Sequence, residues 1–264
     1  MEPGALQLEV EDLSLRFGGV QALDHVTLQV HQGHIHAVIG PNGAGKTSLL
    51  NCVNGLYRPQ GGRIRLHTGQ AIHDLTRARP SRIASWGVAR TFQNIELFKH
   101  MSVLDNLLLG RHVHLDNRLV ASLAFFGPGR RQEIEHRRLV EEVVDLLEIQ
   151  AVRSKPVDSL SYGFQKRVEL GRALCLQPAV LLLDEPMAGM NAEEKEDMAR
   201  YILDVNQQAG VTVLLIEHDM GVVMDISDRV SVLDFGRKIA DGVPERVQDD
   251  QAVIDAYLGE ERPR

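Results

Sequence analysis

The chain is poor in the features that mark secreted or membrane-spanning proteins. Its 264 residues include two cysteines and one tryptophan, and aromatic residues make up 5%. Cys52 and Cys175 form neither a Cys-x-x-Cys pair nor a disulfide framework, and their apolar surroundings predict small buried side chains. No apolar run approaches the ~18 residues that cross a bilayer. The opening M-E-P-G-A-L lacks the basic and apolar regions of a secretory signal, so we expect a cytoplasmic chain.

The charge balance is acidic, with a formal net charge of −7. This charge argues against a dedicated nucleic-acid binder. Charged residues make up 25% and hydrophobic ones 44%, as in soluble globular proteins. The length suits one large α/β domain or two small ones.

The most informative stretch is G-P-N-G-A-G-K-T at 40–47, which fits the phosphate-binding P-loop. It follows an apolar β-like run at 35–39 and opens a helix-like run at 48–54, which is the context that the motif needs. Its glycines let backbone N–H groups face the phosphates, and the helix N-terminus attracts anions. Lys46 is placed to reach the β- and γ-phosphates of ATP, and the Thr47 hydroxyl to bind Mg²⁺. The predicted nucleotide contacts here are Gly40, Asn42, Gly43, Ala44, Gly45, Lys46, Thr47 and Ser48.

The periodicity around this loop predicts a wound α/β core. Residues 6–10 and 26–30 alternate apolar and polar side chains, as half-buried antiparallel strands do. The apolar runs 180–183 and 211–216 are typical of strands buried on both faces in a parallel sheet. Each follows a helix-like segment, and this alternation of strand and helix indicates an α/β fold.

The middle of the chain, from about 95 to 158, has a helical pattern instead. Apolar residues recur at near-helical spacing from 139 to 149, and we expect the polar, glycine-containing stretch 127–138 to be a break before that helix. Near the end of the chain, D-F-G at 234–236 lies between two strand-like runs, which predicts a hairpin turn.

A second strong signal is A-V-L-L-L-D-E-P at 179–186, an apolar strand that ends in two carboxylates. In a wound sheet this edge is where ligands bind. Asp184 is a candidate Mg²⁺ ligand, and Glu185 a candidate to orient or deprotonate an attacking water.

The third signal is L-S-Y-G-F-Q-K-R at 160–167, and with it the chain resembles the ATP-binding subunits of ABC transporters. The ordered set of motifs comprises the P-loop, Gln93 in R-T-F-Q, the L-S-x-G stretch 160–163, the acidic strand end 180–185, A-G-M-N at 188–191 and His218 in I-E-H-D. The resemblance covers residues 6–247. It implies a single P-loop NTPase cassette with a mainly parallel core sheet, an antiparallel β subdomain and an inserted helical subdomain at about 95–158. Residues 248–264 would form a C-terminal tail.

The resemblance also implies a mechanism in which two such domains pack head to tail around two ATP molecules. Phe17 matches the aromatic residue that stacks on adenine, with ordinary core packing as the alternative. Ser161 and Gly163 would contact the γ-phosphate held by the opposite subunit.

For hydrolysis, the resemblance implies that Gln93 senses Mg²⁺ and the attacking water. His218 would contact the γ-phosphate and hold the geometry of Glu185. Asp184 and Thr47 complete the set of candidate Mg²⁺ ligands.

The L-S-x-G stretch departs from the commonest L-S-G-G-Q, with Tyr162 for the first glycine and Phe164 for the glutamine. These two changes put the strength of the γ-phosphate contact in question. A bulky residue at this position resembles the pattern of one branch of the family, the importers of hydrophobic amino acids. R-T-F-Q-N-I-E-L-F at 90–98, the extra segment at about 111–138 and the ending A-Y-L-G-E at 256–260 resemble the longer ATPase subunit of branched-chain amino-acid importers.

The partners that this resemblance implies are membrane permease subunits, a second ATPase subunit that is identical or a paralogue, and indirectly a solute-binding protein. The chain would then lie at the cytoplasmic face of the membrane. We expect the surface at 94–100 to dock the permease, with Leu97 and Phe98 as anchors unless they pack in the core. Importers of urea or of aromatic or carboxylic acids stay open as alternatives, as do a soluble non-transport ABC ATPase and, less in keeping with Glu185, a small-molecule kinase.

Overall fold

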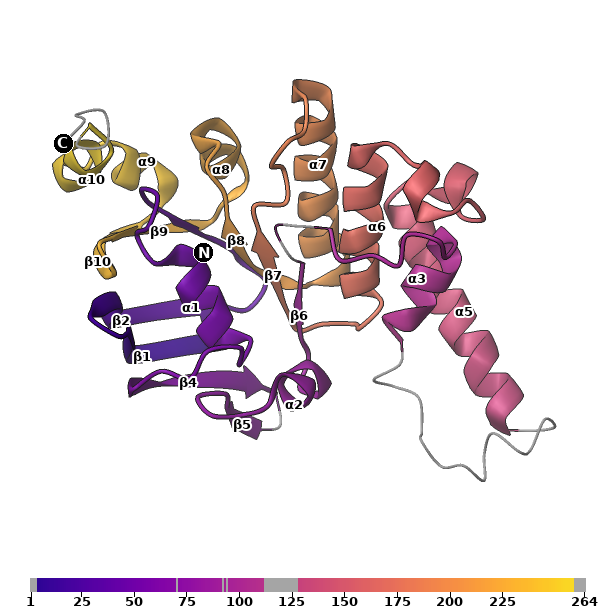
Figure 1. Ribbon diagram of the computed structural model, residues 1–264, viewed down its shortest axis with the longest axis horizontal. Helices are drawn as coiled ribbons and strands as arrows, with labels where there is room; N and C mark the ends of the chain where they lie inside the picture. The colour runs from indigo at the N-terminus through magenta and orange to yellow at the C-terminus, as the bar shows by residue number, and fades with distance from the viewer. Residues whose placement is uncertain (1–3, 70, 92, 94, 112–127, 259–264) are drawn as a thin grey trace.

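The computed structural model in Figure 1 describes residues 4–69, 71–91, 93, 95–111 and 128–258, with side chains left out at 128–133. Parts of several predictions therefore lie outside the described residues. These are Phe92 of R-T-F-Q, Asn94 of the expected docking surface, most of the extra segment at 111–138, and the last residues of A-Y-L-G-E and of the tail.

A six-stranded sheet forms the centre of the molecule, in the order β10-β9-β3-β8-β7-β6. Its neighbouring strands run parallel, apart from the antiparallel β9–β10 pair. The strands are β3 (Ile35–Ile39), β6 (Val88–Arg90), β7 (Val180–Asp184), β8 (Thr212–Ile216), β9 (Arg229–Asp234) and β10 (Arg237–Gly242). Every residue of β3, β7 and β8 is buried, which explains why their sequences are mostly apolar.

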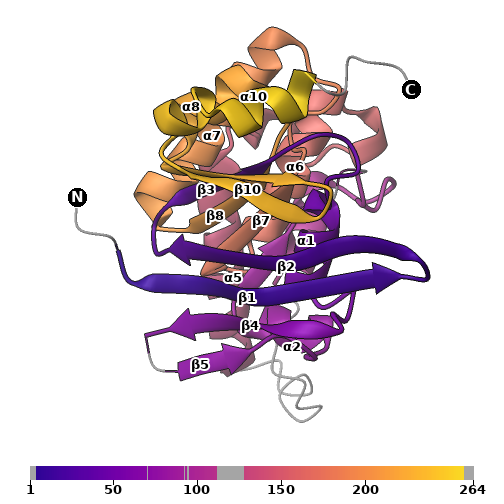
Figure 2. The same ribbon diagram turned by 90° about the vertical axis from the view of Figure 1, so that its left-hand side faces the viewer.

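A second, antiparallel sheet has the order β2-β1-β4-β5, and Figure 2 shows its strands stacked one above another. They are β1 (Leu6–Phe17), β2 (Val20–His31), β4 (Gly61–Thr68) and β5 (Ala71–Asp74). The alternation of buried and exposed side chains in β1 and β2 continues well beyond the runs 6–10 and 26–30 from which it was predicted. Asp12 has a φ of +53°, and the β1–β2 register shifts between Val10 and Leu13, so the alternation changes phase there.

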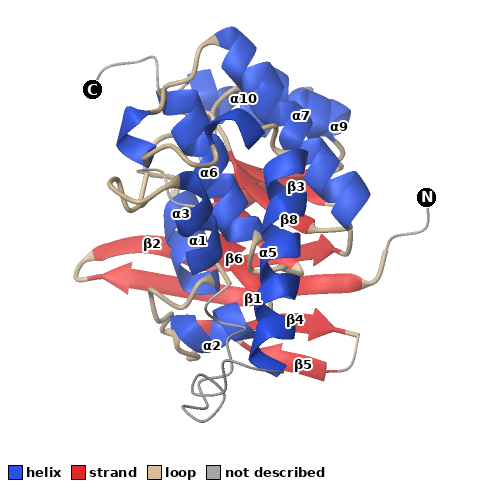
Figure 3. Ribbon diagram, turned by 90° about the vertical axis from the view of Figure 1, so that its right-hand side faces the viewer, coloured by secondary structure: helices blue, strands red, loops and turns tan. Residues whose placement is uncertain are grey.

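Helices cover both faces of the parallel sheet. They are α1 (Lys46–Val53), α2 (Pro80–Ser85), α3 (Val103–Leu109), α5 (Pro128–Leu146), α6 (Tyr162–Leu174), α7 (Ala192–Ala209), α8 (Met220–Ile226), α9 (Pro244–Gln248) and α10 (Gln251–Leu258), with 3-10 turns at Gln150–Val152 and Val157–Ser159. The helices α3 and α5 of the expected insertion, together with α6 that follows it, face the viewer in Figure 3.

Alternate residues of the parallel strands feed two separate hydrophobic cores. Val180 and Leu182 of β7 point toward α1 and the antiparallel sheet. Leu181 and Leu183 point to the opposite face, into the core formed with α3, α5, α6 and α7. The helix α1 is therefore enclosed between the two sheets, while α6 and α7 lie across the parallel sheet from it. This arrangement confirms the α/β fold class.

One local prediction was wrong. The polar stretch 127–138 is not a break, because α5 runs without interruption from Pro128 to Leu146. Proline is tolerated in the first turn of a helix, and the Arg, Gln and Glu residues that follow are good helix formers. The helix also ends before the expected 149, and Glu148 adopts a φ of +53°.

Other local predictions are confirmed. D-F-G at 234–236 is the turn of the β9–β10 hairpin. Cys52 and Cys175 are buried free thiols, and burial raises the pKa of each to about 12. Leu97 is buried in the helical core, whereas Phe98 next to it is 57% exposed. Within the described part of the chain, no helix combines the length and apolarity needed to cross a membrane.

Candidate nucleotide-binding site

The P-loop connects the buried strand β3 to α1, as its sequence predicts. Gly45 is the N-cap of α1 with a φ of +103°, and Gly40 has a φ of +145°. A Cβ atom at Gly40 would lie 2.0 Å from the carbonyl oxygen of Leu233, so only glycine fits against the β9–β10 hairpin there. The backbone of this hairpin and the P-loop also bond directly, through Gly236 N–H and the Ala44 carbonyl at 3.0 Å.

The P-loop side chains differ in their exposure. Lys46 is 6% exposed, and its Nζ donates to the Gly40 carbonyl at 2.6 Å and the Pro41 carbonyl at 2.9 Å. The ammonium group is thus held over the loop it belongs to. Thr47 and Asn42 are exposed and Ser48 is half-buried. The loop can therefore present hydroxyl, amide and backbone groups to an anion in solvent.

Asp184 ends β7 and is 2% exposed. Its Oδ2 forms an ion pair with Arg90 at 2.8 Å, and Arg90 also donates to Asn51 Oδ1 of α1 at 2.5 Å. Asp184 Oδ1 is buried and has no hydrogen-bond partner among the residues that the structure describes. A buried carboxylate oxygen without a donor, next to a phosphate-binding loop, suits a hard cation such as Mg²⁺.

Glu185 lies where two other predicted site residues converge. Its Oε2 accepts a hydrogen bond from Gln93 Nε2 at 2.8 Å, and its Oε1 lies 2.8 Å from His218 Nε2. Its φ of +50° is rare for a residue of this type and is the kind of strained geometry that clusters at active sites. The structure thus unites residues from three distant motifs around one carboxylate.

Three residues that support this group did not emerge from the motifs. Glu217 is 4% exposed, and its two carboxylate oxygens accept hydrogen bonds from the N–H groups of Met187 at 2.8 Å and His218 at 3.1 Å. Burial raises the pKa of Glu217 above its ordinary value. Lys166, 3% exposed, donates to the Gln93 carbonyl at 2.8 Å. The third is Arg90, and no local sequence signal marked any of the three, because each acts through a partner far away in the sequence.

Phe17 ends β1 and is 45% exposed, so the core-packing alternative is wrong. Its ring meets that of Tyr57 edge to face, with centroids 5.0 Å apart and planes at 74°. The start of β2 packs on the P-loop, because a Cβ at Gly45 would lie 2.5 Å from the Ala22 carbonyl oxygen. The aromatic edge at Phe17 therefore belongs to the same side of the molecule as the loop.

Ser161 and Gly163 are not united with the P-loop within the chain. Ser161 is the N-cap of α6, and Gly163 lies in its first turn. Since α6 packs on the face of the parallel sheet opposite to α1, these residues are across the sheet from residues 40–48. A γ-phosphate contact from Ser161 thus requires another copy of such a domain.

A P-loop between a buried parallel strand and a helix, with two acidic residues at the end of a neighbouring strand, defines a nucleoside-triphosphate-binding domain. The sequence family described as "ABC transporter" matches residues 23–188, and the family "Branched-chain amino acid ATP-binding cassette transporter" matches residues 237–263. The chain belongs to the ATP-binding subunits of ABC transporters, which confirms the resemblance seen in the sequence.

Known relatives span nearly the whole chain. The "high-affinity branched-chain amino acid transport ATP-binding protein BraF" of Pseudomonas aeruginosa is 43% identical over 96% of this chain and 98% of its own length. LivG of Escherichia coli, described in the same words, is 39% identical with the same coverage. A solved nucleotide-free ATP-binding cassette from an ABC transporter superimposes with a TM-score of 0.81 at 30% identity, covering 96% of this chain and 98% of that one.

Proposed function

We propose that the chain hydrolyses ATP as the motor subunit of an importer for branched-chain or other hydrophobic amino acids. The observation that carries the enzymatic part is the convergence of Gln93 and His218 on Glu185, beside Asp184 and the P-loop. The observation that favours this solute class is the identity of 39–43% to transport proteins named for branched-chain amino acids.

In this proposal the P-loop and its helix bind the triphosphate. Backbone N–H groups of residues 40–48 contact the phosphates, and Lys46 turns from its carbonyl partners toward the β- and γ-phosphates. Phe17 offers its exposed ring to adenine, with Tyr57 supporting it from the side. Thr47, Asp184 and Gln93 would hold Mg²⁺, which when bound neutralises charge on the phosphate oxygens.

Hydrolysis in this proposal depends on Glu185 as general base. Its carboxylate takes the proton of the water whose oxygen bonds to the γ-phosphorus, as the bond from that phosphorus to the β–γ bridging oxygen breaks and ADP leaves. His218 and Gln93 fix the orientation of the carboxylate through their 2.8 Å contacts. Glu217 holds the His218 backbone and the turn after Glu185 in place. The second half of each site would come from Ser161 and Gly163 of another ATPase subunit, either a copy of this chain or a paralogue.

For transport, the proposal places the cassette of residues 6–247 at the cytoplasmic face of the membrane, bound to permease subunits. Phe98 is the candidate anchor, because it is 57% exposed within the segment that follows Gln93. Coupling ATP binding to transport requires an element with two conformations whose populations are shifted by nucleotide. We propose that the segment next to Gln93 is that element. A solute-binding protein would act only through the permease, and we propose no nucleic-acid partner.

The test is reconstitution with candidate permease subunits. Purified chain should release phosphate from ATP with Mg²⁺, and cells carrying chain and permease should take up leucine. The Lys46→Ala variant should abolish both and serves as the control for contaminating ATPases. Uptake of urea or of an aromatic acid in place of leucine would overturn the solute class, and ATP turnover by the purified chain with no uptake of any of these solutes would favour a non-transport ATPase.

A further inference from the structure

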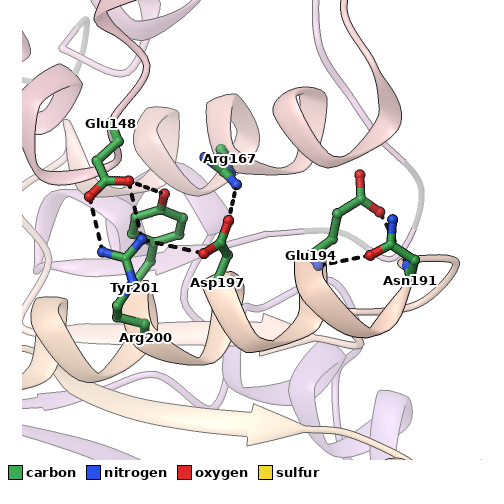
Figure 4. A network of polar contacts seen from close by, with 7 residues as sticks. All are labelled: Glu148, Arg167, Asn191, Glu194, Asp197, Arg200 and Tyr201. Carbon is green, nitrogen blue, oxygen red and sulfur yellow. Dashed lines mark hydrogen bonds and ion pairs between the residues drawn. The ribbon is translucent and has the colours of Figure 1, made fainter.

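The N-terminal halves of α6 and α7 lie beside each other and are bridged by an ion pair. Arg167 on α6 and Asp197 on α7 form an ion pair at 2.5 Å, which is drawn as a dashed line in Figure 4. Each lies the same number of residues beyond the N-cap of its helix, Ser161 in α6 and Asn191 in α7. The pair therefore fixes the two helix N-termini at the same level.

The Arg167 side chain is held on both sides before it meets Asp197. Its guanidinium lies 5.1 Å from the ring centroid of Phe164 and 4.9 Å from that of Tyr201. The Tyr201 hydroxyl donates a hydrogen bond to Glu148. Both carboxylate oxygens of Glu148 also accept hydrogen bonds from the Arg200 guanidinium, each at 3.1 Å (Figure 4). Arg167 and Asp197 are 15% and 35% exposed, so the pair is shielded compared with an ordinary surface ion pair.

The segments that precede the two helices also touch. A Cβ at Gly189 would lie 3.3 Å from Cε1 of Tyr162, so the tyrosine that replaces glycine in L-S-Y-G is in close range of the A-G-M-N turn. A Cβ at Gly163 would lie 2.4 Å from Glu194 Oε1. Glu194 in turn closes a capping box with Asn191. Residues 161–163 and 188–194 are thus packed into one surface.

We infer that Arg167 and Asp197 are positioning residues for the composite ATP site. They lock the N-terminus of α6 to that of α7, so that Ser161, Gly163 and the 188–191 turn approach the ATP-loaded P-loop of a second subunit as one rigid surface. The inference rests on the proposed function, since it concerns the site that two ATPase subunits would share. Tyr162 then compensates for the lost glycine by packing against Gly189, rather than weakening the contact.

The test uses the Glu185→Gln background, in which ATP should hold two copies of the chain together, and follows dimerisation by sedimentation at increasing ATP. Asp197→Asn removes the charge and keeps the shape. We expect it to raise the ATP concentration for half-maximal dimerisation roughly 5- to 25-fold, since a partly buried pair is lost at both shared sites. The affinity of the monomer for ATP should be unchanged, because the P-loop lies across the sheet. Asp197→Glu should restore dimerisation.

The matched control is Glu141→Gln, which removes a charge from the exposed ion pair between Glu141 and Arg153 and leaves the charges of Arg167 and Asp197 in place. It should dimerise at the same ATP concentration as its parent. Dimerisation of Asp197→Asn at the same ATP concentration as its parent, or an equal shift in Glu141→Gln, would overturn the inference. If the Glu185→Gln parent itself formed no dimer with ATP, the proposed function would fail and the inference with it.

Discussion

Replacing Glu185 by glutamine separates base chemistry from binding. The carboxylate receives Gln93 Nε2 on one oxygen and faces His218 Nε2 on the other, each at 2.8 Å. A glutamine amide still accepts one of these bonds with its oxygen. Its NH₂ group then faces the second partner, which must accept a hydrogen bond. Gln93 can do so by flipping its amide, and His218 by adopting the other imidazole tautomer. The local geometry therefore survives at a cost of about 1 kcal/mol.

The rate, by contrast, loses the proton acceptor. A general base contributes ~10²–10⁴-fold, or roughly 3–5 kcal/mol of barrier. We expect phosphate release at saturating ATP to fall by at least ~10², with ATP affinity unchanged and an ATP-bound dimer accumulating. Single-turnover phosphate release, equilibrium ATP binding and sedimentation measure these three quantities. Glu245→Gln, an exposed carboxylate on the first turn of α9, is the control for the change in charge. Near-normal turnover in Glu185→Gln would refute the assignment of the base.

Three further outcomes follow from individual side chains. Lys46→Ala should leave the thermal midpoint without nucleotide similar but abolish the ATP-induced stabilisation, which is about 2.7 kcal/mol at about 100 times Kd for a binding-competent chain; unfolding of the nucleotide-free variant would make the lysine structural. Phe98→Asp should stop leucine uptake while ATP binding persists, whereas Leu97→Asp, in the core, should unfold the chain; normal uptake with Phe98→Asp would place the docking surface elsewhere. Burial lowers the pKa of His36 from 6.5 to about 3, so the unfolded chain binds a proton below pH 6.5 that the folded chain excludes. Stability from this residue is present above pH 6.5 and lost as the pH falls toward 3, and urea titrations should show a shallower loss in His36→Gln.

The strands that carry the site were predictable from sequence because they are short and buried on both faces. For β3 and β7, the apolar run ends where the ligand-facing residues begin, so the run itself marks the strand. The long strands β1 and β2 were only partly visible, since bulges shift their alternation. In α5 the polar sequence concealed a helix, because its arginines and glutamates leave no apolar stripe before residue 134.

The residues of the candidate site also divide into those that were predictable from the sequence and those that were not. The residues that we propose to face nucleotide belong to motifs with fixed spacing, and the resemblance transferred them together. Arg90, Glu217 and Lys166 act through partners far away in the sequence, namely Asp184, Met187 and Gln93. No local pattern encodes such pairs, because each depends on how two loops meet after the sheet has formed.

The close fit between the P-loop and the β9–β10 hairpin has a consequence for the timing of synthesis. The loop is complete by Thr47, but the Leu233 carbonyl that it rests on and the Gly236 N–H that bonds it are made much later. At about 5–20 residues per second, roughly 10–40 s separate the two on the ribosome. We expect stalled nascent chains that end before the β9–β10 hairpin not to bind ATP-agarose. Chains long enough to expose the hairpin outside the ribosome should be retained on it. A nascent chain would thus not bind cellular ATP until most of its fold has formed.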